Sequence, residues 1–254
     1  MTGKTAILKL KGVKKNFGGV MAVDDLSMEI VPGQVCGLIG PNGAGKTTVF
    51  NLITGVHRCQ HGSISLGGME ITSAKPYRIT RLGVARTFQT IRLFPSLSTF
   101  EHVRVAQTCV SAFRREQDAV SGGSSRGKLQ EEAAGLLSLL GLWEARNHKA
   151  VTLPYGSQRK VEIARALATR PRLLLLDEPV AGMNARETEE LLLIISKIRE
   201  MGITILLIDH DMKFVMGLCD RLWVLNFGRK IAEGTPQEIQ RNEFVLEAYL
   251  GREG

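Results

Sequence analysis

The octapeptide GPNGAGKT at residues 40–47 fits the pattern G-x-x-x-x-G-K-[ST]. It follows an apolar run, Val35–Ile39, and opens a segment of helical character, Thr47–Ile53, which is the setting in which such a loop holds phosphate. Its glycines let main-chain N–H groups surround phosphate oxygens, and the helix adds positive charge at its amino end. We expect Lys46 to reach the β- and γ-phosphates and the hydroxyl group of Thr47 to bind Mg²⁺. The predicted nucleotide-binding residues of this loop are Gly40, Pro41, Asn42, Gly43, Ala44, Gly45, Lys46, Thr47 and Thr48.

A second motif, LLLLDEP at residues 173–179, places two carboxylates at the end of an apolar run. Asp177 can hold Mg²⁺ through water, and Glu178 can orient and polarise an attacking water molecule. On its own this motif would also fit an acidic turn that ends a strand. Together with the phosphate loop, it predicts hydrolysis of a nucleoside triphosphate.

A third polar site is His210, in LLIDHD at residues 206–211. A single histidine is more often structural than catalytic. Here it follows another apolar run, and open α/β sheets bind their ligands at the carboxyl ends of their strands. An imidazole in that position could sense or stabilise the γ-phosphate.

The segment LPYGSQRKVEIARAL at residues 153–167 is expected to form a helix that opens at Pro154. The phosphate loop already has a helix of its own, so the amino end of this second helix lacks an obvious ligand within one chain. Gly156 is a poor residue for a helix interior, and its presence indicates close approach of the main chain to another group.

The elements needed to position these residues alternate between strands and helices, except in the middle of the chain. From about Thr99 to Ala168 strand patterns give way to helical ones, interrupted by a polar insert at Arg115–Lys128 that is expected to be a mobile surface loop. Two fully apolar strands flank the helix Glu187–Met201, which indicates a βαβ unit inside a sheet covered on both faces. These two apolar strands are expected at Leu173–Leu176 and Thr204–Ile208. Further strands are expected at Ile7–Leu10, Leu26–Ile30 and Val35–Ile39, and a hairpin of Leu222–Leu225 with Lys230–Ala232.

The predicted fold class is therefore α/β. We expect a P-loop NTPase core with a mixed, mostly parallel sheet, an antiparallel β part near the amino terminus and an inserted helical subdomain. Residues 1–254 would form one domain, with the core at 1–90 and 169–254, the helical subdomain at 91–168 and a carboxyl-terminal tail at 234–254.

Composition narrows the class of protein further. The four cysteines are scattered among 254 residues, which argues against disulfides and a zinc site and favours a reducing cytoplasm. The amino terminus lacks the apolar core of a signal peptide, and no apolar run is long enough to cross a bilayer. The net charge of +8 is consistent with general solubility or with a nearby anionic surface, and no basic block points to nucleic acid.

Taken together, these motifs resemble the ATP-binding subunits of ABC transporters over about residues 8–250. The resemblance implies that ATP and Mg²⁺ are bound, that Phe17 stacks on adenine and that Gln89 touches Mg²⁺ and the lytic water. It also implies that Glu178 is the catalytic base and His210 the switch histidine. In such proteins two domains pair head to tail around two ATP molecules, so the expected contacts to the partner's ATP are Tyr155, Gly156, Ser157 and Gln158.

Two residues depart from the family pattern. Pro154 stands where the family has a serine whose hydroxyl donates to the γ-phosphate, so we expect weaker pairing through the loss of one hydrogen bond, worth about 0.5–1.5 kcal/mol. Ser157 or Gln158 could compensate. Asn184 stands where an aspartate is more usual across the dimer interface, and it keeps the shape but loses the charge.

Three segments, at 83–106, 208–236 and 243–251, resemble the ATPase subunits of bacterial branched-chain amino acid importers. That resemblance implies a permease, an indirect link to a substrate-binding protein, and a peripheral place on the cytoplasmic face of the inner membrane. Ile91, Leu93, Phe94 and Leu97 would either line a groove for a short permease helix or simply fill the helical subdomain. The second ATPase subunit could be identical or different, and the substrate and direction of transport stay open.

Other functions remain as alternatives. The same paired ATPase could serve urea import or lipopolysaccharide export. A non-transport ATPase of chromosome organisation would need a long coiled-coil insert, and translation-linked relatives carry two phosphate loops. A P-loop kinase or GTPase would not need the 153–167 helix or His210. Intact Lys46, Asp177 and Glu178 argue against a non-enzymatic scaffold.

Overall fold

The computed structural model describes residues 5–114 and 126–250. Its larger sheet, sheet B, has the strand order β10-β9-β3-β8-β7-β6, in which only β10 runs antiparallel to its neighbour. The predicted mixed, mostly parallel sheet is thus confirmed. Its strands are β3 (Val35–Ile39), β6 (Val84–Arg86), β7 (Leu173–Asp177), β8 (Thr204–Ile208), β9 (Arg221–Asn226) and β10 (Arg229–Gly234).

A smaller antiparallel sheet, sheet A, has the strand order β2-β1-β4-β5. The two strands expected at Ile7–Leu10 and Leu26–Ile30 continue into one long hairpin, which pairs from Leu8 with Ile30 to Phe17 with Val20. Register shifts between Leu10 and Asn16 interrupt the alternation of buried and exposed side chains, so the sequence pattern indicated only the open end of the hairpin. The strands of sheet A are β1 (Leu8–Phe17), β2 (Val20–Ile30), β4 (His61–Leu66) and β5 (Met69–Glu70).

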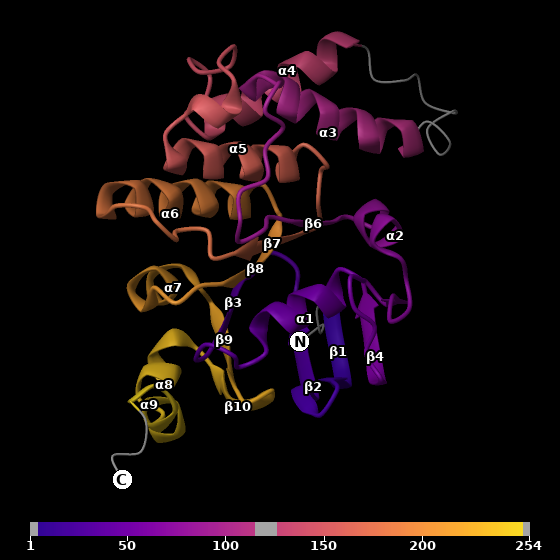
Figure 1. Ribbon diagram of the computed structural model, residues 1–254, viewed down its shortest axis with the longest axis vertical. Helices are drawn as coiled ribbons and strands as arrows, with labels where there is room; N and C mark the ends of the chain where they lie inside the picture. Colours follow the sequence, from indigo (N-terminus) through magenta and orange to yellow (C-terminus); the bar gives the residue numbers. More distant parts are fainter. Residues whose placement is uncertain (1–4, 115–125, 251–254) are drawn as a thin grey trace.

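Helices account for most of the middle of the chain, and Figure 1 shows α3, α4 and α5 stacked at the end of the molecule away from sheet A. The last three residues of the predicted loop at 115–128 form the first turn of α4, and its residues 115–125 lie outside the described part. The helices are α1 (Lys46–Ile53), α2 (Pro76–Arg81), α3 (Thr99–Arg114), α4 (Arg126–Leu139), the 3-10 helix η1 (Ala150–Thr152), α5 (Tyr155–Leu167), α6 (Ala185–Glu200), α7 (Met212–Leu218), α8 (Pro236–Gln240) and α9 (Glu243–Leu250).

Both faces of sheet B are buried, as the apolar strands predicted. In β7, Leu174 and Leu176 face a core shared with α3 to α7, whereas Leu173 and Leu175 face a second core built around α1 and sheet A. All four side chains are fully buried. Since alternate side chains of a strand point to opposite faces, helices must cover the sheet on one side and α1 with sheet A on the other. The βαβ unit β7-α6-β8 is confirmed, because β7 and β8 are parallel neighbours.

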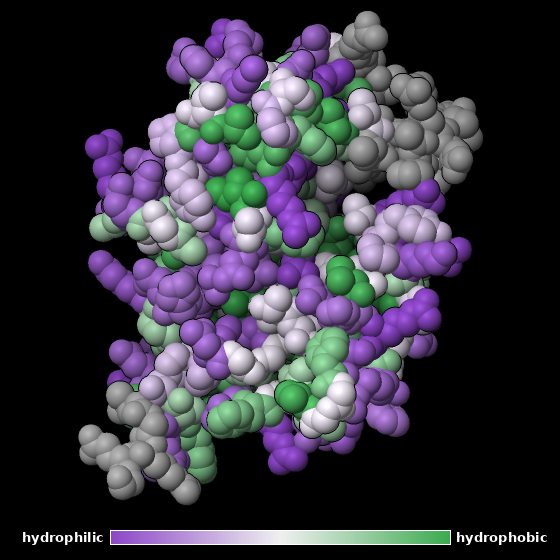
Figure 2. All heavy atoms as spheres, viewed as in Figure 1, coloured by the Kyte–Doolittle hydropathy of each residue, from purple (hydrophilic) through white to green (hydrophobic). Residues whose placement is uncertain are grey.

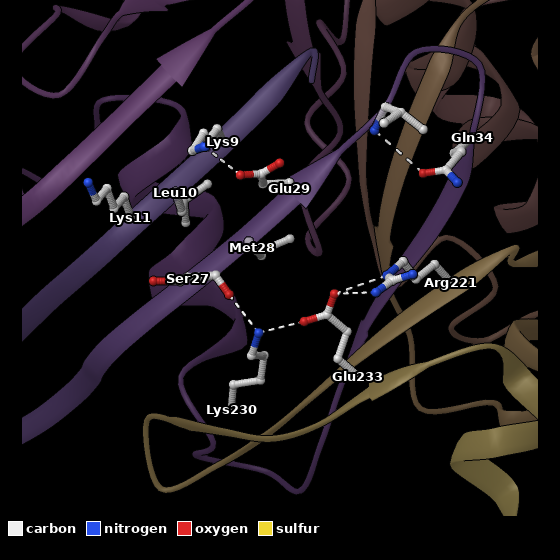
Figure 3. Close-up of a pocket in the computed structure, with 11 residues that line it drawn as sticks. Lys9, Leu10, Lys11, Ser27, Met28, Glu29, Gln34, Arg221, Lys230 and Glu233 are labelled. Atoms are coloured by element: carbon white, nitrogen blue, oxygen red, sulfur yellow. Dashed lines mark hydrogen bonds and ion pairs between the residues drawn. The ribbon is translucent and has the colours of Figure 1, made fainter. Parts of the chain in front are cut away.

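The two sheets also meet along a polar seam formed by β1, β2, β9 and β10, and a cavity of about 600 Å³ opens there (Figure 3). Its charges are largely paired with one another. Lys9 lies 2.5 Å from Glu29, and Glu233 contacts both Lys230 at 2.5 Å and Arg221 at 2.6 Å. Lys230 Nζ also donates to Ser27 O at 2.9 Å, and this bond links β10 of sheet B to β2 of sheet A.

None of the helices within residues 5–114 and 126–250 is long and apolar enough to cross a lipid bilayer.

Candidate nucleotide-binding and hydrolysis site

The predicted functional residues follow the carboxyl ends of four parallel strands of sheet B. Gly40 follows β3, Gln89 lies three residues beyond β6, Glu178 follows β7 and His210 lies two residues beyond β8. Because β3, β6, β7 and β8 run in the same direction, these four segments meet at one edge of the sheet. The parallel topology thus brings together motifs that are up to 170 positions apart in the chain.

The phosphate loop packs closely between sheet A and strand β9. A Cβ atom at Gly40 would collide with the carbonyl oxygen of Leu225, and one at Gly45 would collide with that of Ala22. Both glycines have positive φ angles, of 146° and 102°. Glycine is required at both positions because no other residue combines this conformation with such close main-chain contacts. Gly228 supports the loop from the β9–β10 turn by donating its N–H to Ala44 O at 3.0 Å.

Lys46 begins α1 and points back over the loop. Its Nζ atom donates to the carbonyl oxygens of Gly40 at 2.7 Å and Pro41 at 2.8 Å. Burial lowers the pKa of Lys46, and the nearby carboxylates of Glu178 and Asp177 oppose that shift. The ammonium group is therefore held within the loop by the loop's own carbonyl oxygens.

Asp177 ends β7 and is paired with an arginine that the sequence analysis did not identify. Arg86 Nη2 lies 2.8 Å from Asp177 Oδ2, and both side chains are almost fully buried. Arg86 Nη1 donates to Asn51 Oδ1 in α1 at 2.7 Å. Arg86 stands three residues before Gln89, at the end of the short strand β6. In the sequence it could not be distinguished from an ordinary strand residue.

Glu178 lies at the centre of the predicted catalytic residues. Gln89 Nε2 donates to Glu178 Oε2 at 3.0 Å, and His210 Nδ1 lies 4.0 Å from the same oxygen. Glu178 has a left-handed main chain, with φ of 47°, which is uncommon for a residue other than glycine. Its N–H donates to Ile208 O at 2.8 Å, so the strand that leads to His210 helps to hold this conformation.

Asp209, which the sequence analysis did not single out, holds the turn that carries His210. Its Oδ1 atom accepts from the N–H groups of His210 at 2.8 Å and Asp211 at 3.0 Å, and its Oδ2 atom accepts from Val180 at 3.4 Å. Burial raises the pKa of Asp209. His210 itself is largely exposed, so a neighbouring molecule or ligand can reach its ring.

A buried arginine of α5 fixes the segment that carries Gln89. Arg159 Nη1 donates to Phe88 O at 2.6 Å, and its Nη2 donates to Gln89 O at 2.8 Å. Glu162 lies 2.9 Å from Arg159 Nη1 and also accepts from the N–H of Arg92 at 3.0 Å. Both charged side chains are fully buried. The helix expected to face a partner's ATP is therefore tied directly to Gln89, although neither Arg159 nor Glu162 was predicted as a functional residue.

The amino end of α5 differs in detail from the prediction. Pro154 is the N-cap residue with an extended ψ of 151°, so it precedes the first helical turn that it was expected to form. The amide of Gln158 donates to Val151 O at 3.1 Å and Leu153 O at 2.8 Å, and it holds the preceding loop. These bonds engage both donors of the Gln158 amide, which leaves Ser157 as the side chain that could replace the missing serine.

Gly156 has a contact within its own chain that explains its small size. A Cβ atom there would lie 2.6 Å from Oε1 of Glu187, near the start of α6. Glu187 forms a capping box with Asn184, whose Oδ1 accepts from Glu187 N at 3.0 Å and whose N–H donates to Glu187 Oε2 at 3.0 Å. The departure at Asn184 therefore preserves the helix cap, since asparagine and aspartate cap equally well.

Phe17 lies at the end of β1 and is about 43% exposed. Its ring meets that of His57 edge to face at 5.1 Å, and the ammonium group of Lys15 lies 4.9 Å from its centroid. An exposed aromatic ring in this setting can stack on a flat ligand.

The apolar residues beyond Gln89 divide into two groups. Leu93 packs on the core of the helical region, whereas Phe94 is about 51% exposed. His102 orders this segment because its Nε2 atom accepts from the N–H of Phe94 at 2.9 Å, with Nδ1 2.8 Å from Ser98 O. Ile91 and Leu97 are half-buried. Figure 2 shows apolar side chains among hydrophilic ones over this helical end of the molecule.

Comparison with known proteins decides the family. Residues 23–181 match the model of the ABC transporter family. The chain belongs to the ABC transporter family of ATP-binding proteins. It is an ATP-binding cassette ATPase, with the cassette fold that the sequence predicted.

Individual relatives are similar to this cassette over nearly its whole length. The high-affinity branched-chain amino acid transport ATP-binding protein BraF of Pseudomonas aeruginosa is 44% identical over 258 aligned residues, covering 96% of this cassette and 98% of BraF. The ADP-bound cassette MJ1267 superimposes with a TM-score of 0.85 and 30% identity, covering 98% and 100% of the two chains. The dimeric cassette MJ0796 with ADP and Pi gives a TM-score of 0.77 at 25% identity, covering 90% and 98%.

The carboxyl-terminal part of the cassette has its own match. Residues 229–254 fit the model described as the branched-chain amino acid ATP-binding cassette transporter. Within the described residues this segment comprises β10, α8 and α9. It carries α9 beside the phosphate loop, since Pro41 lines a cavity together with Phe244 and Glu247.

Proposed function

We propose that this cassette hydrolyses ATP to drive the import of branched-chain amino acids through a membrane permease. The observation that carries the proposal is the convergence of Lys46, Asp177 and Glu178 at one edge of sheet B, with Gln89 Nε2 3.0 Å from Glu178. The cargo is supported by the match of residues 229–254 and by the 44% identity to BraF. A periplasmic or surface substrate-binding protein would select the amino acid, because no part of the cassette needs to touch it.

Mg²⁺ fits the donor groups at this edge. Thr47 supplies a hydroxyl and Asp177 a carboxylate, which are the hard oxygen ligands that Mg²⁺ prefers. Within the described residues no group of three or more His, Cys, Asp and Glu side chains could hold a metal ion alone. Mg²⁺ is usually held by one or two protein groups together with nucleotide phosphates, and Gln89 would complete the set. When bound, the ion would neutralise charge that develops on the phosphates.

Hydrolysis then depends on four side chains of this chain, and a fifth binds the adenine. Lys46 exchanges its bonds to Gly40 and Pro41 for phosphate oxygens. Glu178 accepts a proton from the attacking water, and Gln89 orients both Glu178 and that water. His210, exposed beside Glu178, donates to the γ-phosphate. Phe17 stacks on the adenine ring.

A second cassette completes the site. The N–H groups of Tyr155, Gly156 and Ser157 open α5, and Pro154 carries no side-chain cap for them. Such a helix end favours an anion, and the γ-phosphate of ATP held by the partner is the anion that the dimeric arrangement presents. The partner can be a second copy or a related ATPase. Pairing places both cassettes against the permease on the cytoplasmic face of the membrane.

Uptake of labelled amino acids tests the proposal. In cells that carry the cognate permease, replacing the cassette with Lys46→Ala should reduce leucine, isoleucine and valine uptake to background, because the variant cannot hold the phosphates. Uptake of lysine by the same cells is the control and should not change. Normal branched-chain amino acid uptake, with loss of transport of another solute, would assign a different cargo.

The surface around Phe94 gives a second test, now of the permease contact. The double variant Phe94→Glu/Leu97→Glu should lose transport while it keeps its affinity for ATP, since charged side chains cannot enter an apolar contact. Met201→Glu is a matched control, because Met201 is also an exposed apolar residue but follows α6. Unimpaired transport in the double variant would place the permease contact elsewhere.

A further inference from the structure

Arg86 connects three elements of the nucleotide site through its buried contacts with Asn51 and Asp177, which together form the Arg86 bracket. From the end of β6 it contacts Asp177 in β7 at 2.8 Å and Asn51 in α1 at 2.7 Å. Its guanidinium group also lies 5.4 Å from the ring centroid of Phe50 and 5.1 Å from that of Phe88. Only about 6% of the Arg86 side chain and 3% of the Asp177 side chain are exposed. Because burying such a pair is costly, its geometry must be well determined.

The bracket acts on the two residues proposed to hold Mg²⁺. Thr47 and Asn51 are four positions apart in α1, so they lie on the same face of that helix. Arg86 holds the Asn51 end of this face against Asp177. The separation between the Thr47 hydroxyl and the Asp177 carboxylate therefore depends on the length and planar shape of one guanidinium group. Since Asp177 Oδ2 is bound by Arg86, the bracket also decides which oxygen of the carboxylate can face the metal.

We propose that Arg86 is a positioning residue for the divalent cation, which sets the spacing and orientation of Thr47 and Asp177 through its simultaneous contacts with Asn51 and Asp177. The proposal rests on the metal role given above to these two residues. A lysine at position 86 keeps the charge beside Asp177 but cannot bridge two acceptors with a rigid fork. Groups that orient metal ligands typically change metal affinity by about 10–100-fold when they are replaced.

Binding measurements separate this role from a purely structural one. We expect Arg86→Lys to bind a fluorescent ATP analogue in EDTA as the wild type does, but to lose most of the affinity that Mg²⁺ adds. Binding of Mn²⁺ in the presence of ADP, followed by electron paramagnetic resonance, should weaken about 10-fold. Arg221→Lys is the matched control, because Arg221 pairs with Glu233 at the distant seam between the sheets (Figure 3). It should leave both measurements unchanged.

The other end of the bracket supplies a second variant. Asn51→Leu keeps the shape of the side chain and removes the acceptor for Arg86, so it should weaken Mn²⁺ binding in the same direction by a smaller factor. This variant tests the proposal if Arg86→Lys does not fold.

Each outcome distinguishes the two proposals. A folded Arg86→Lys or Asn51→Leu protein with wild-type Mn²⁺ affinity would overturn the role of Arg86. An equal loss of affinity with and without metal would also overturn it, because the bracket would then act only on the fold. If the wild type gains no affinity for the ATP analogue from Mg²⁺, the metal role of Thr47 and Asp177 fails first.

Discussion

Glu178→Gln should abolish ATP turnover and trap the cassette as an ATP-bound dimer. Loss of a general base lowers the rate of the chemical step by about 10²–10⁴-fold. The amide keeps the size of the carboxylate and can still accept the bond from Gln89 Nε2. The left-handed conformation at position 178 is equally demanding for glutamine, so the fold should not change. Phosphate release in saturating MgATP measures turnover, and light scattering during size-exclusion chromatography measures the dimer.

Glu190→Gln is the matched control for this experiment. Glu190 is a half-exposed carboxylate on α6 that pairs with Lys160 of α5 at 3.0 Å. This variant should hydrolyse ATP at the wild-type rate and should not accumulate as a dimer. If Glu178→Gln retains wild-type turnover, another residue is the base. If it is inactive but stays monomeric with MgATP, the partner contact proposed for the amino end of α5 is wrong.

Arg159→Leu should cause the largest loss of stability among the changes considered. The substitution leaves Glu162 as a buried charge without its main partner and leaves Phe88 O and Gln89 O without their donor. Breaking a buried pair in this way costs about 3–5 kcal/mol in the free energy of unfolding. Burial already raises the pKa of Glu162, and removal of Arg159 should raise it further. Denaturant unfolding followed by circular dichroism measures the loss.

The neighbouring residue provides the control. Lys160→Leu removes a cation from the next position of α5, but its partner Glu190 is about 45% exposed. A pair of this kind contributes about 0–1 kcal/mol, so the midpoint of denaturant unfolding should change little. Arg159→Leu protein that remains folded should also turn over ATP slowly, since Gln89 is no longer held beside Glu178. Equal unfolding midpoints for the two variants would show that the buried pair does not stabilise the cassette.

The sequence by itself determined the class of the fold and predicted the chemistry of the site. The phosphate loop, the Asp177–Glu178 pair and the apolar strands are local patterns, because each depends on the conformation of a few consecutive residues. The G-x-x-x-x-G-K-[ST] pattern between an apolar strand and a helix predicts a phosphate site wherever it occurs in a chain. For the same reason the βαβ unit around α6 was found with bounds close to the observed ones, Ala185–Glu200.

Only the tertiary structure decided which residues support that chemistry. Arg86 and Arg159 show no motif in the sequence, because Arg86 contacts Asp177, 91 positions away, and Arg159 contacts the carbonyl oxygen of Gln89, 70 positions away. A charged residue in a strand or helix predicts solvent exposure, and burial reverses that expectation only when another element supplies acceptors.

Gly156 illustrates the same difference. The sequence analysis explained its small size by a phosphate of a partner's ATP, and the structure adds a reason within one chain, the carboxylate of Glu187 at the start of α6. Local patterns determine which groups can react, since they are set by neighbouring residues. Long-range packing determines how rigidly those groups are held, since each support comes from an element that the sequence places far away.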